Sequence, residues 1–163
     1  MSNYVVFNGK KYPQYQTEGF AAQFVFPFAQ KYCEGTGYDI GCSKLEWCLP
    51  GAIPIDVTLE NKYDAYALPS EQVDYIFSSH CLEHLPNWCE ALDYWISKLK
   101  PSGRLFLYLP DYSQEYWRPW NCAKHVHYFT SNVLVDFLES REMKDIESSS
   151  PDLNNSFCVT CKK

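Results

Sequence analysis

Two histidines and a glutamate lie close together in the segment 74–88, which reads DYIFSSHCLEHLPNW. The spacing His80-x-x-Glu83-His84 matches H-x-x-E-H, a pattern in which two imidazoles hold a zinc ion and the carboxylate acts as a general base. That chemistry requires a helix that begins well before the first histidine. Residues 73–79 are instead rich in β-branched and aromatic types, which predicts a strand. We therefore expect no zinc ion on this motif, and we expect His80 at a strand end, facing a site.

Two further pairs of residues have the types that bind metals. His125 and His127 are separated by one residue, so in a strand both side chains would lie on the same face. Cys158 and Cys161 have the spacing of half a zinc site, but the chain has no second cysteine pair at a suitable distance. A lone pair of histidines more often serves as a polar group of the surface or core than as a ligand set. We therefore predict that the chain binds no metal.

Acidic residues lie in or at the ends of three apolar stretches: Asp39 in GYDIG, Asp56 in AIPIDV and Asp64 in YDAYALP. Each of them alone is read as a turn residue, or, for Asp39, as a structural acid that accepts hydrogen bonds from the backbone. The polar run 78–84 follows a fourth stretch of this kind. Because the carboxyl ends of parallel strands meet at one edge of a sheet, these residues together predict a ligand site at that edge.

Strand-like and helix-like stretches alternate along the chain, which is typical of βαβ units and a mostly parallel sheet. Strands are expected at 37–41, 52–57, 73–79 and 104–110, and a short extended segment at 63–69. Helices are expected at 18–33, 87–100 and 130–141, and an antiparallel strand pair at 144–150 and 155–162. The predicted fold class is α/β and Rossmann-like, with trimmed helices on both faces of the sheet and the antiparallel pair at the C-terminus.

The length and composition favour one globular domain. With 163 residues, of which 46% are hydrophobic and 21% charged, the chain is long enough to bury a core. We expect a single domain over 1–163, with an N-terminal hairpin and helix in 1–34 and a ligand-binding core in 35–163. The pair Asn8-Gly9 between two apolar and aromatic arms predicts the hairpin. Its aromatic edge makes it a candidate for homodimerisation.

The charge and the hydropathy pattern argue against several classes of partner. A formal net charge of −6 argues against binding to nucleic acid. No stretch approaches the ~20 apolar residues that span a bilayer, and the first residues lack the features of a signal peptide. Most of the eight cysteines lie in apolar runs, as buried, reduced thiols do. These features favour a cytoplasmic protein with no membrane or nucleic-acid partner.

Taken together, the motifs resemble those of the class I S-adenosylmethionine-dependent methyltransferases, over about residues 35–163. The resemblance is strongest to the small branch that carries SSHxLEHL after the fourth strand, here SSHCLEHL. GYDIGCS is similar to the family's first motif and GAIPIDV to its second-strand motif. LKPSGRLFLYLP is similar to the turn and fifth strand of the family, and HVHYFTSNVLVDFLESREM to the stretch that leads into its last large helix.

This resemblance implies S-adenosylmethionine as the cofactor and assigns it a set of contacts. Gly41 would let the backbone approach the methionine portion, Asp56 would hold the ribose hydroxyls, and Asp64 would accept from the adenine amino group. The full set of implied cofactor residues is Asp39, Gly41, Cys42, Ser43, Asp56, Asp64, Ala65, Ser78 and Ser79. The chain departs from the family pattern at Ser43, where a second glycine is usual, and at Leu45, where a third often lies.

The reaction implied is methyl transfer to a small-molecule or glycan-like acceptor. His80 is the first candidate for a general base, with His125 and His127 as the other candidates. The aromatic segment 111–127 would form a wall or lid over the acceptor, or would simply pack against the sheet. The alternative function is a non-catalytic binding or regulatory module with the same fold, which the missing glycines and trimmed helices would suit.

Overall fold

The structure is a computed structural model that describes residues 4–14, 20–60 and 63–163. Its strands are β1 (Tyr4–Phe7), β2 (Lys10–Pro13), β3 (Gly37–Ile40), β4 (Ile53–Ile55), β5 (Val73–Ser79), β6 (Leu99–Pro110), β7 (Lys144–Ser148) and β8 (Ser156–Lys162). Its α-helices are α2 (Phe26–Ala29), α3 (Trp88–Lys98) and α4 (Ser131–Ser140). Four short 3₁₀ helices are η1 (Ala21–Phe24), η2 (Leu45–Trp47), η3 (Leu82–His84) and η4 (Glu115–Trp117). No helix in the described part of the chain is long and apolar enough to cross a membrane.

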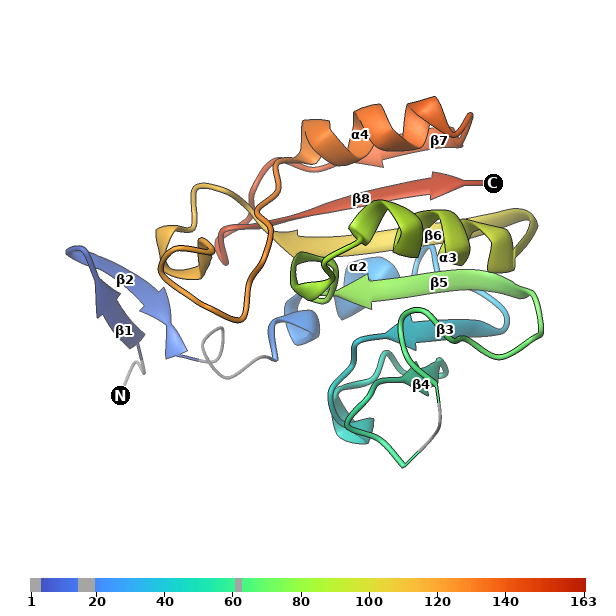
Figure 1. Cartoon of the computed structure of the whole chain (residues 1–163), viewed down its shortest axis with the longest axis horizontal. Helices are drawn as coiled ribbons and strands as arrows, with labels where there is room; N and C mark the ends of the chain where they lie inside the picture. The colour runs from blue at the N-terminus through green and yellow to red at the C-terminus, as the bar shows by residue number, and fades with distance from the viewer. Residues whose placement is uncertain (1–3, 15–19, 61–62) are drawn as a thin grey trace.

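The main sheet has six strands in the order β4-β3-β5-β6-β8-β7 (Figure 1). The first four run parallel, while β8 is antiparallel to both β6 and β7. This confirms the predicted fold class, a mostly parallel Rossmann-like sheet with an antiparallel C-terminal pair. The chain leaves β3 to form β4 on one side and returns to form β5 on the other, so the strand order reverses at β3. A ligand site is expected beside the carboxyl ends of strands at such a reversal.

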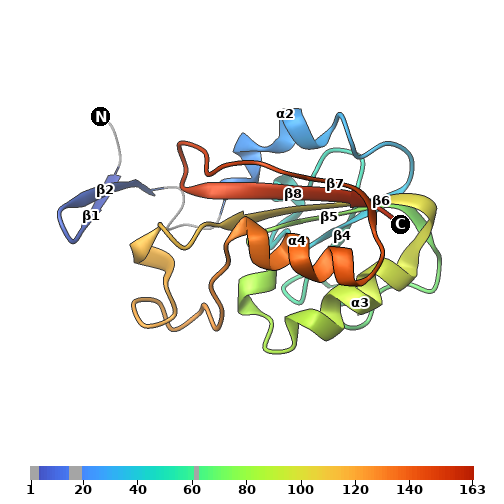
Figure 2. The same cartoon turned by 90° about the horizontal axis from the view of Figure 1, so that it is seen from above.

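Helices cover both faces of the sheet, but unequally (Figure 2). The longer helices α3 and α4 lie on one face, where Trp95 and Leu138 are buried against alternate residues of β6 such as Leu105. The opposite face is covered by the short elements η1 and α2, which bury Val25 and Ala29 against the other residues of the strands, among them Phe106. The two-residue alternation of a buried strand therefore divides the core into two clusters.

The helix expected at 18–33 is wrong in most of its length. Residues 18 and 19 lie outside the described part of the chain, and the rest forms only η1, α2 and turns. Pro27 lies inside the single turn of α2, where its ring is tolerated because the amide at a helix start has no partner to lose. The helices expected at 87–100 and 130–141 are confirmed as α3 and α4. The expected strand at 52–57 is shorter, as β4.

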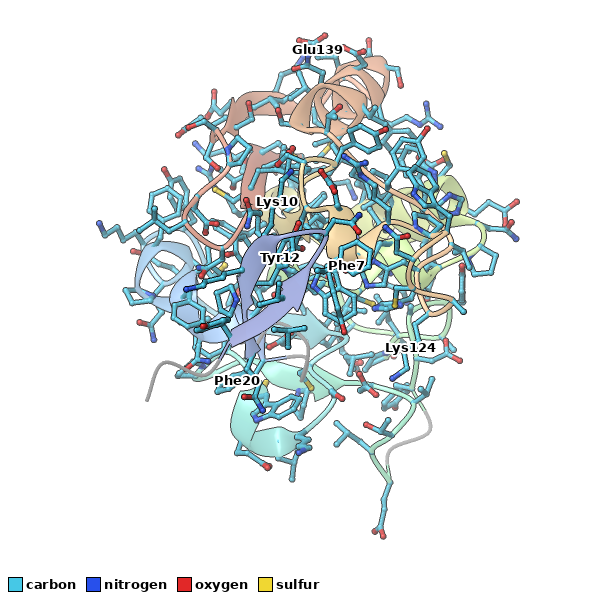
Figure 3. All side chains as sticks on the ribbon, turned by 90° about the vertical axis from the view of Figure 1, so that its left-hand side faces the viewer. Phe7, Lys10, Tyr12, Phe20, Lys124 and Glu139 are labelled. Atoms are coloured by element: carbon cyan, nitrogen blue, oxygen red, sulfur yellow. The ribbon has the colours of Figure 1, made fainter. Side chains whose placement is uncertain are left out.

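The predicted hairpin is confirmed as β1 and β2, with Asn8 and Gly9 both at positive φ in the turn. Part of its aromatic surface is used within the chain. Phe7 and Tyr12 contact the ring of Tyr116 with centroids 5.7 and 5.9 Å away. Figure 3 views the molecule from the end that carries the hairpin, with Phe7 and Tyr12 labelled on it. The hairpin is thus packed against the segment that follows β6.

Candidate functional site

A cavity of about 390 Å³ lies where the chain leaves β3, β4 and β5. Gly41 and Ser43 line it after β3, Asp56 after β4, and Ser79 and His80 at the end of β5. The segment after β6 contributes Trp117, Lys124 and His125. The cavity therefore lies at the reversal of strand order, as the sequence predicted for its polar cluster, and its volume is in the range of small-molecule sites.

The turn after β3 has a conformation that favours glycine at two positions. Gly41 has a φ of 88°, and a side chain there would place its Cβ 2.4 Å from Cβ of Cys81. Ser43 has a φ of 66°, which is also left-handed. Ser43 therefore departs from the glycine of the family pattern in its side chain while it keeps a backbone conformation that glycine adopts easily.

Asp56 ties this turn to the end of β4. Its Oδ2 accepts a hydrogen bond from the backbone N–H of Ser43 at 2.8 Å, and its Oδ1 accepts one from the N–H of Thr58 at 2.9 Å. The hydroxyl of Thr58 lies between Oδ1 and the carbonyl of Ser43. Each carboxylate oxygen has two lone pairs, so Oδ2 can accept one further donor from a ligand in the cavity.

Asp39 and Cys42, two of the predicted contacts, do not line the cavity. Asp39 is 1% exposed, and its Oδ2 accepts a hydrogen bond from the N–H of Leu49 at 2.6 Å. Burial raises the pKa of its carboxyl to about 7, against the opposing effect of that hydrogen bond. Cys42 is buried nearby, where it interacts with the thiol of Cys48. Asp39 therefore has the second role that the sequence offered for it, that of a structural acid that accepts a hydrogen bond from the backbone.

Asp64, Ser78 and His127 also lie outside the cavity lining, because each side chain has a partner elsewhere. Asp64 accepts from the N–H of Tyr66, as a turn residue does, and Ser78 donates to the carbonyl of Ile40. Nε2 of His127 is 3.0 Å from the carbonyl oxygen of Pro86, to which it donates. Ala65, by contrast, does line the cavity.

His80 directly follows β5 in a strained, partly buried position. Its φ is 48°, which is uncommon for a residue other than glycine, and its backbone N–H donates to the carbonyl of Tyr108. Nε2 lies 3.1 Å from Oγ of Ser156. Burial, with smaller effects from His125 and His84, lowers the pKa of its ring to about 3. The ring is therefore neutral near pH 7 and is a weak base.

Glu83 is fully buried in η3, three residues after His80. Its side chain is 0% exposed, and neither carboxylate oxygen has a hydrogen-bond partner in the described part of the chain. Nδ1 of His80 lies 3.7 Å from Oε1, outside hydrogen-bond distance. Burial raises the pKa of Glu83 to about 7, although the His84 ring and the residue's own backbone amide act in the opposite direction.

His84 and His125 come together beside Glu83, from segments far apart in the sequence. Their ring centroids are 4.6 Å apart, and Nδ1 of His84 is 2.7 Å from the carbonyl oxygen of Lys124. The His125 ring stacks on Trp117 at 4.9 Å, and burial lowers the pKa of His125 to about 4. Sequence reasoning considered Glu83 and His84 within their own motif and His125 within another, so it missed this contact.

The aromatic segment after β6 divides into two parts. Trp117 lines the cavity, and its indole N–H is buried without a hydrogen-bond partner in the described residues. Tyr112, Trp120 and Tyr128 instead contact one another on the surface, with centroid distances from 5.0 to 6.4 Å. Of the aromatic residues expected to form a wall over the acceptor, Trp117 lines the cavity, whereas Tyr112, Trp120 and Tyr128 do not. Ser79 adds a second buried polar atom without a partner, its Oγ.

Comparison with known proteins gives a family and a fold. A family model described as a methyltransferase domain matches residues 19–147. A search of curated protein sequences finds no significant match.

Several solved structures share the fold. A SAM-dependent methyltransferase from Archaeoglobus fulgidus is 19% identical, with a TM-score of 0.65 over 93% of this chain and 100% of that one. The N-methyltransferase NodS from Bradyrhizobium japonicum, in complex with S-adenosyl-L-homocysteine, is 15% identical, with a TM-score of 0.60 over 91% and 87%. The 1,6-didemethyltoxoflavin-N1-methyltransferase of Burkholderia thailandensis, with its substrate and S-adenosylhomocysteine bound, is also 15% identical, with a TM-score of 0.65 over 92% and 81%.

Proposed function

The chain belongs to the methyltransferase domain family, with S-adenosylmethionine as its cofactor, and on this premise we propose how its cavity is divided between that cofactor and an acceptor. The cofactor supplies an electrophilic methyl group bound to a positively charged sulfur. We place its binding surface at Gly41, Ser43, Asp56, Ala65 and Ser79, and the acceptor at the histidines. The acceptor proposed is a small molecule or a glycan-like compound.

The residues at the turn end of the cavity fit this cofactor. Gly41 lines the cavity, and the position that its side chain would take is already filled by Cys81, so the turn requires glycine there. Asp56 has an unused lone pair on Oδ2, which suits a ribose hydroxyl. Ser79 brings a buried hydroxyl that has no hydrogen-bond partner among the described residues. We propose that the Ser43 hydroxyl donates to the cofactor's carboxylate, and so replaces a backbone contact that a glycine turn would make.

The other end of the cavity suits an acceptor that requires orientation more than a strong base. His80 and His125 have pKa values of about 3 and 4, so near pH 7 both rings are neutral and accept protons poorly. We propose that they hold the acceptor by hydrogen bonds while Trp117 contacts one of its faces. His127, which pairs with Pro86, is not assigned a part in the reaction.

The observation that supports this function best is the position of the cavity, bordered by the Gly41 turn and Asp56 at the reversal of strand order. Titration calorimetry with S-adenosylmethionine and S-adenosylhomocysteine tests it. We expect one molecule of either compound to bind each chain and to raise the melting temperature. If neither compound binds, the alternative of a non-catalytic module with this fold replaces the proposal.

A further inference from the structure

Glu83 presents a buried carboxyl group without a hydrogen-bond partner in the described part of the chain. Its side chain is 0% exposed, and neither oxygen accepts a hydrogen bond in the described part of the chain. A carboxylate removed from water without a partner is strongly destabilising, and proteins satisfy such groups with ion pairs, hydrogen bonds or metal ions. The position of Glu83 therefore indicates a cationic ligand that is bound between it and its neighbours.

Two imidazoles are placed to bind the same ligand. One potential ligand atom from each of Glu83, His84 and His125 lies within 4.8 Å of the other two. The hydrogen bond from Nδ1–H of His84 to the carbonyl of Lys124 leaves the lone pair of Nε2 available. Metal-binding histidines usually donate their second N–H to a carbonyl or carboxylate in this way. The His125 ring is held by its stacking on Trp117 and by a hydrogen bond to the Trp117 backbone.

We propose that Glu83, His84 and His125 bind a divalent transition-metal cation of the zinc type. Two imidazoles and one carboxylate are the protein ligands of several catalytic zinc sites, in which a fourth position stays open. The proposal departs from the sequence expectation of no metal. The reason is spatial: His80, the first residue of the apparent motif, is not in the cluster, and its place is taken by His125.

The proposed ion would lie at the acceptor end of the cavity, because His84 and His125 both line that cavity and a ligand atom of the buried Glu83 lies within 4.8 Å of theirs. Its open position would take an oxygen, nitrogen or sulfur atom of the acceptor. A bound hydroxyl or thiol then loses its proton to solvent at lower pH, because coordination lowers its pKa. This use of the ion rests on the proposed function, with the difference that His125 would then hold the acceptor through the ion and His80 alone would bond to it directly.

The test is zinc binding by the full chain with any affinity tag removed. After dialysis against a chelator, the protein is titrated with Zn²⁺ in competition with a chromophoric chelator, and with Co²⁺ monitored by absorption. We expect one equivalent of zinc and a cobalt spectrum of low-symmetry coordination without the intense sulfur-to-cobalt bands that cysteine ligands give. His84→Ala, which alters an exposed side chain, and the near-isosteric Glu83→Gln should each weaken zinc binding at least about 100-fold.

His127→Ala is the matched control, since it removes a histidine from the same segment that pairs with Pro86 outside the cluster. It should leave zinc affinity unchanged. Absence of stoichiometric zinc in the wild type, binding that survives His84→Ala, or sulfur-to-cobalt bands would overturn the proposal. Calorimetry with S-adenosylhomocysteine on the same samples separates the two claims. Zinc without S-adenosylhomocysteine binding supports the metal site and rejects the proposed function, whereas the reverse rejects the metal site alone.

Discussion

At one end of the cavity both oxygens of Asp56 accept hydrogen bonds from the chain, whereas near the other end both oxygens of Glu83 accept none from the described residues. The Asp56 end is closed by contacts among Asp56, Ser43 and Thr58. At the Glu83 end, the indole N–H of Trp117 is also buried without a partner in the described residues. The two carboxylates thus differ, since the chain satisfies that of Asp56 and provides no hydrogen-bond partner among the described residues for that of Glu83.

This difference distinguishes polar groups that the folded chain satisfies by itself from polar groups that remain available to a ligand. An unsatisfied buried polar group costs about 1–3 kcal/mol, so several of them together weigh heavily against a domain's marginal stability. The Asp56 end has its geometry fixed before any ligand arrives, which favours reliable binding of one cofactor. The Glu83 end has buried polar groups for which the described residues provide no hydrogen-bond partner. Binding there should therefore stabilise the chain more than contact area alone would suggest.

The largest expected effect concerns cofactor affinity at the Asp56 end. Asp56→Ala removes the proposed acceptor for the ribose and also frees the N–H of Ser43. We expect S-adenosylhomocysteine to bind about 1.5–3 kcal/mol more weakly, about 10- to 150-fold, which is the usual contribution of a hydrogen bond to a charged group. Titration calorimetry measures it, and an unchanged affinity would remove Asp56 from the site.

Asp64→Ala is the control for that measurement, because Asp64 accepts from the Tyr66 backbone and does not line the cavity. We expect its affinity for S-adenosylhomocysteine to equal that of the wild type. A loss as large as for Asp56→Ala would instead support the contact with adenine that the family resemblance implied.

A second prediction compares the stability of the two ends directly. Glu83→Met keeps the length of the side chain but removes the unsatisfied carboxylate, so in metal-free protein it should raise the free energy of unfolding by about 1–3 kcal/mol. Thr58→Val at the satisfied end removes a hydroxyl between Asp56 and Ser43, and should lower it by about 1 kcal/mol. Urea denaturation in the presence of a chelator measures both. A less stable Glu83→Met would mean that the carboxylate has a partner such as ordered water.

Much of this framework could be predicted from the sequence, because its signals are local. The run 73–79 has the residue types of a buried strand and forms β5 with the same bounds. Gly41, Ser43 and Asp56 follow strands whose order the family motifs indicate, and all three line the cavity. The helix expected at 18–33 was wrong because its apolar residues are spaced for packing onto the sheet, which short turns achieve as well.

The pairing of His84 with His125 could not be predicted in the same way. It depends on how the segment after β6 folds back, where the N–H groups of Val126 and His127 both donate to the carbonyl of Glu83. No periodicity marks such a contact between irregular segments. The positions of Asp39 and Asp64 were equally hidden, since an acid at a strand end can face the cavity or accept from its own backbone.

A third prediction concerns Asp39, a buried acid of β3 that accepts a hydrogen bond from the backbone of Leu49. Its pKa of about 7 in the folded chain is above the ordinary value of 3.8, so folding disfavours the charged form. Its contribution to stability should therefore fall as pH rises from about 4 to about 7, and then level off. We expect wild type to lose on the order of 1–2 kcal/mol relative to Asp39→Asn between pH 5 and 7, measured by urea denaturation. A pH-independent difference between the two proteins would show that Asp39 is ionised throughout.

The smallest expected effect tests whether Ser43 is a compromise between folding and binding. With a φ of 66°, Ser43 has a conformation that costs an L-residue more than glycine. Ser43→Gly relieves that strain but also adds freedom to the unfolded chain, so we expect a net gain of about 0.5–1 kcal/mol in the free energy of unfolding.

Ser43→Ala separates the backbone effect of Ser43 from that of its hydroxyl. Alanine retains the Cβ and hence the strain, so it should bring no gain in stability. If the hydroxyl donates to the cofactor's carboxylate, both variants lose affinity for S-adenosylhomocysteine by about 1 kcal/mol, roughly fivefold. Glycine at this position would then make the turn more stable and the site weaker, because the hydroxyl and not the backbone makes the contact. Tighter binding by Ser43→Gly would show the opposite: the side chain keeps the ligand away from the turn, and the cavity binds its cofactor despite Ser43.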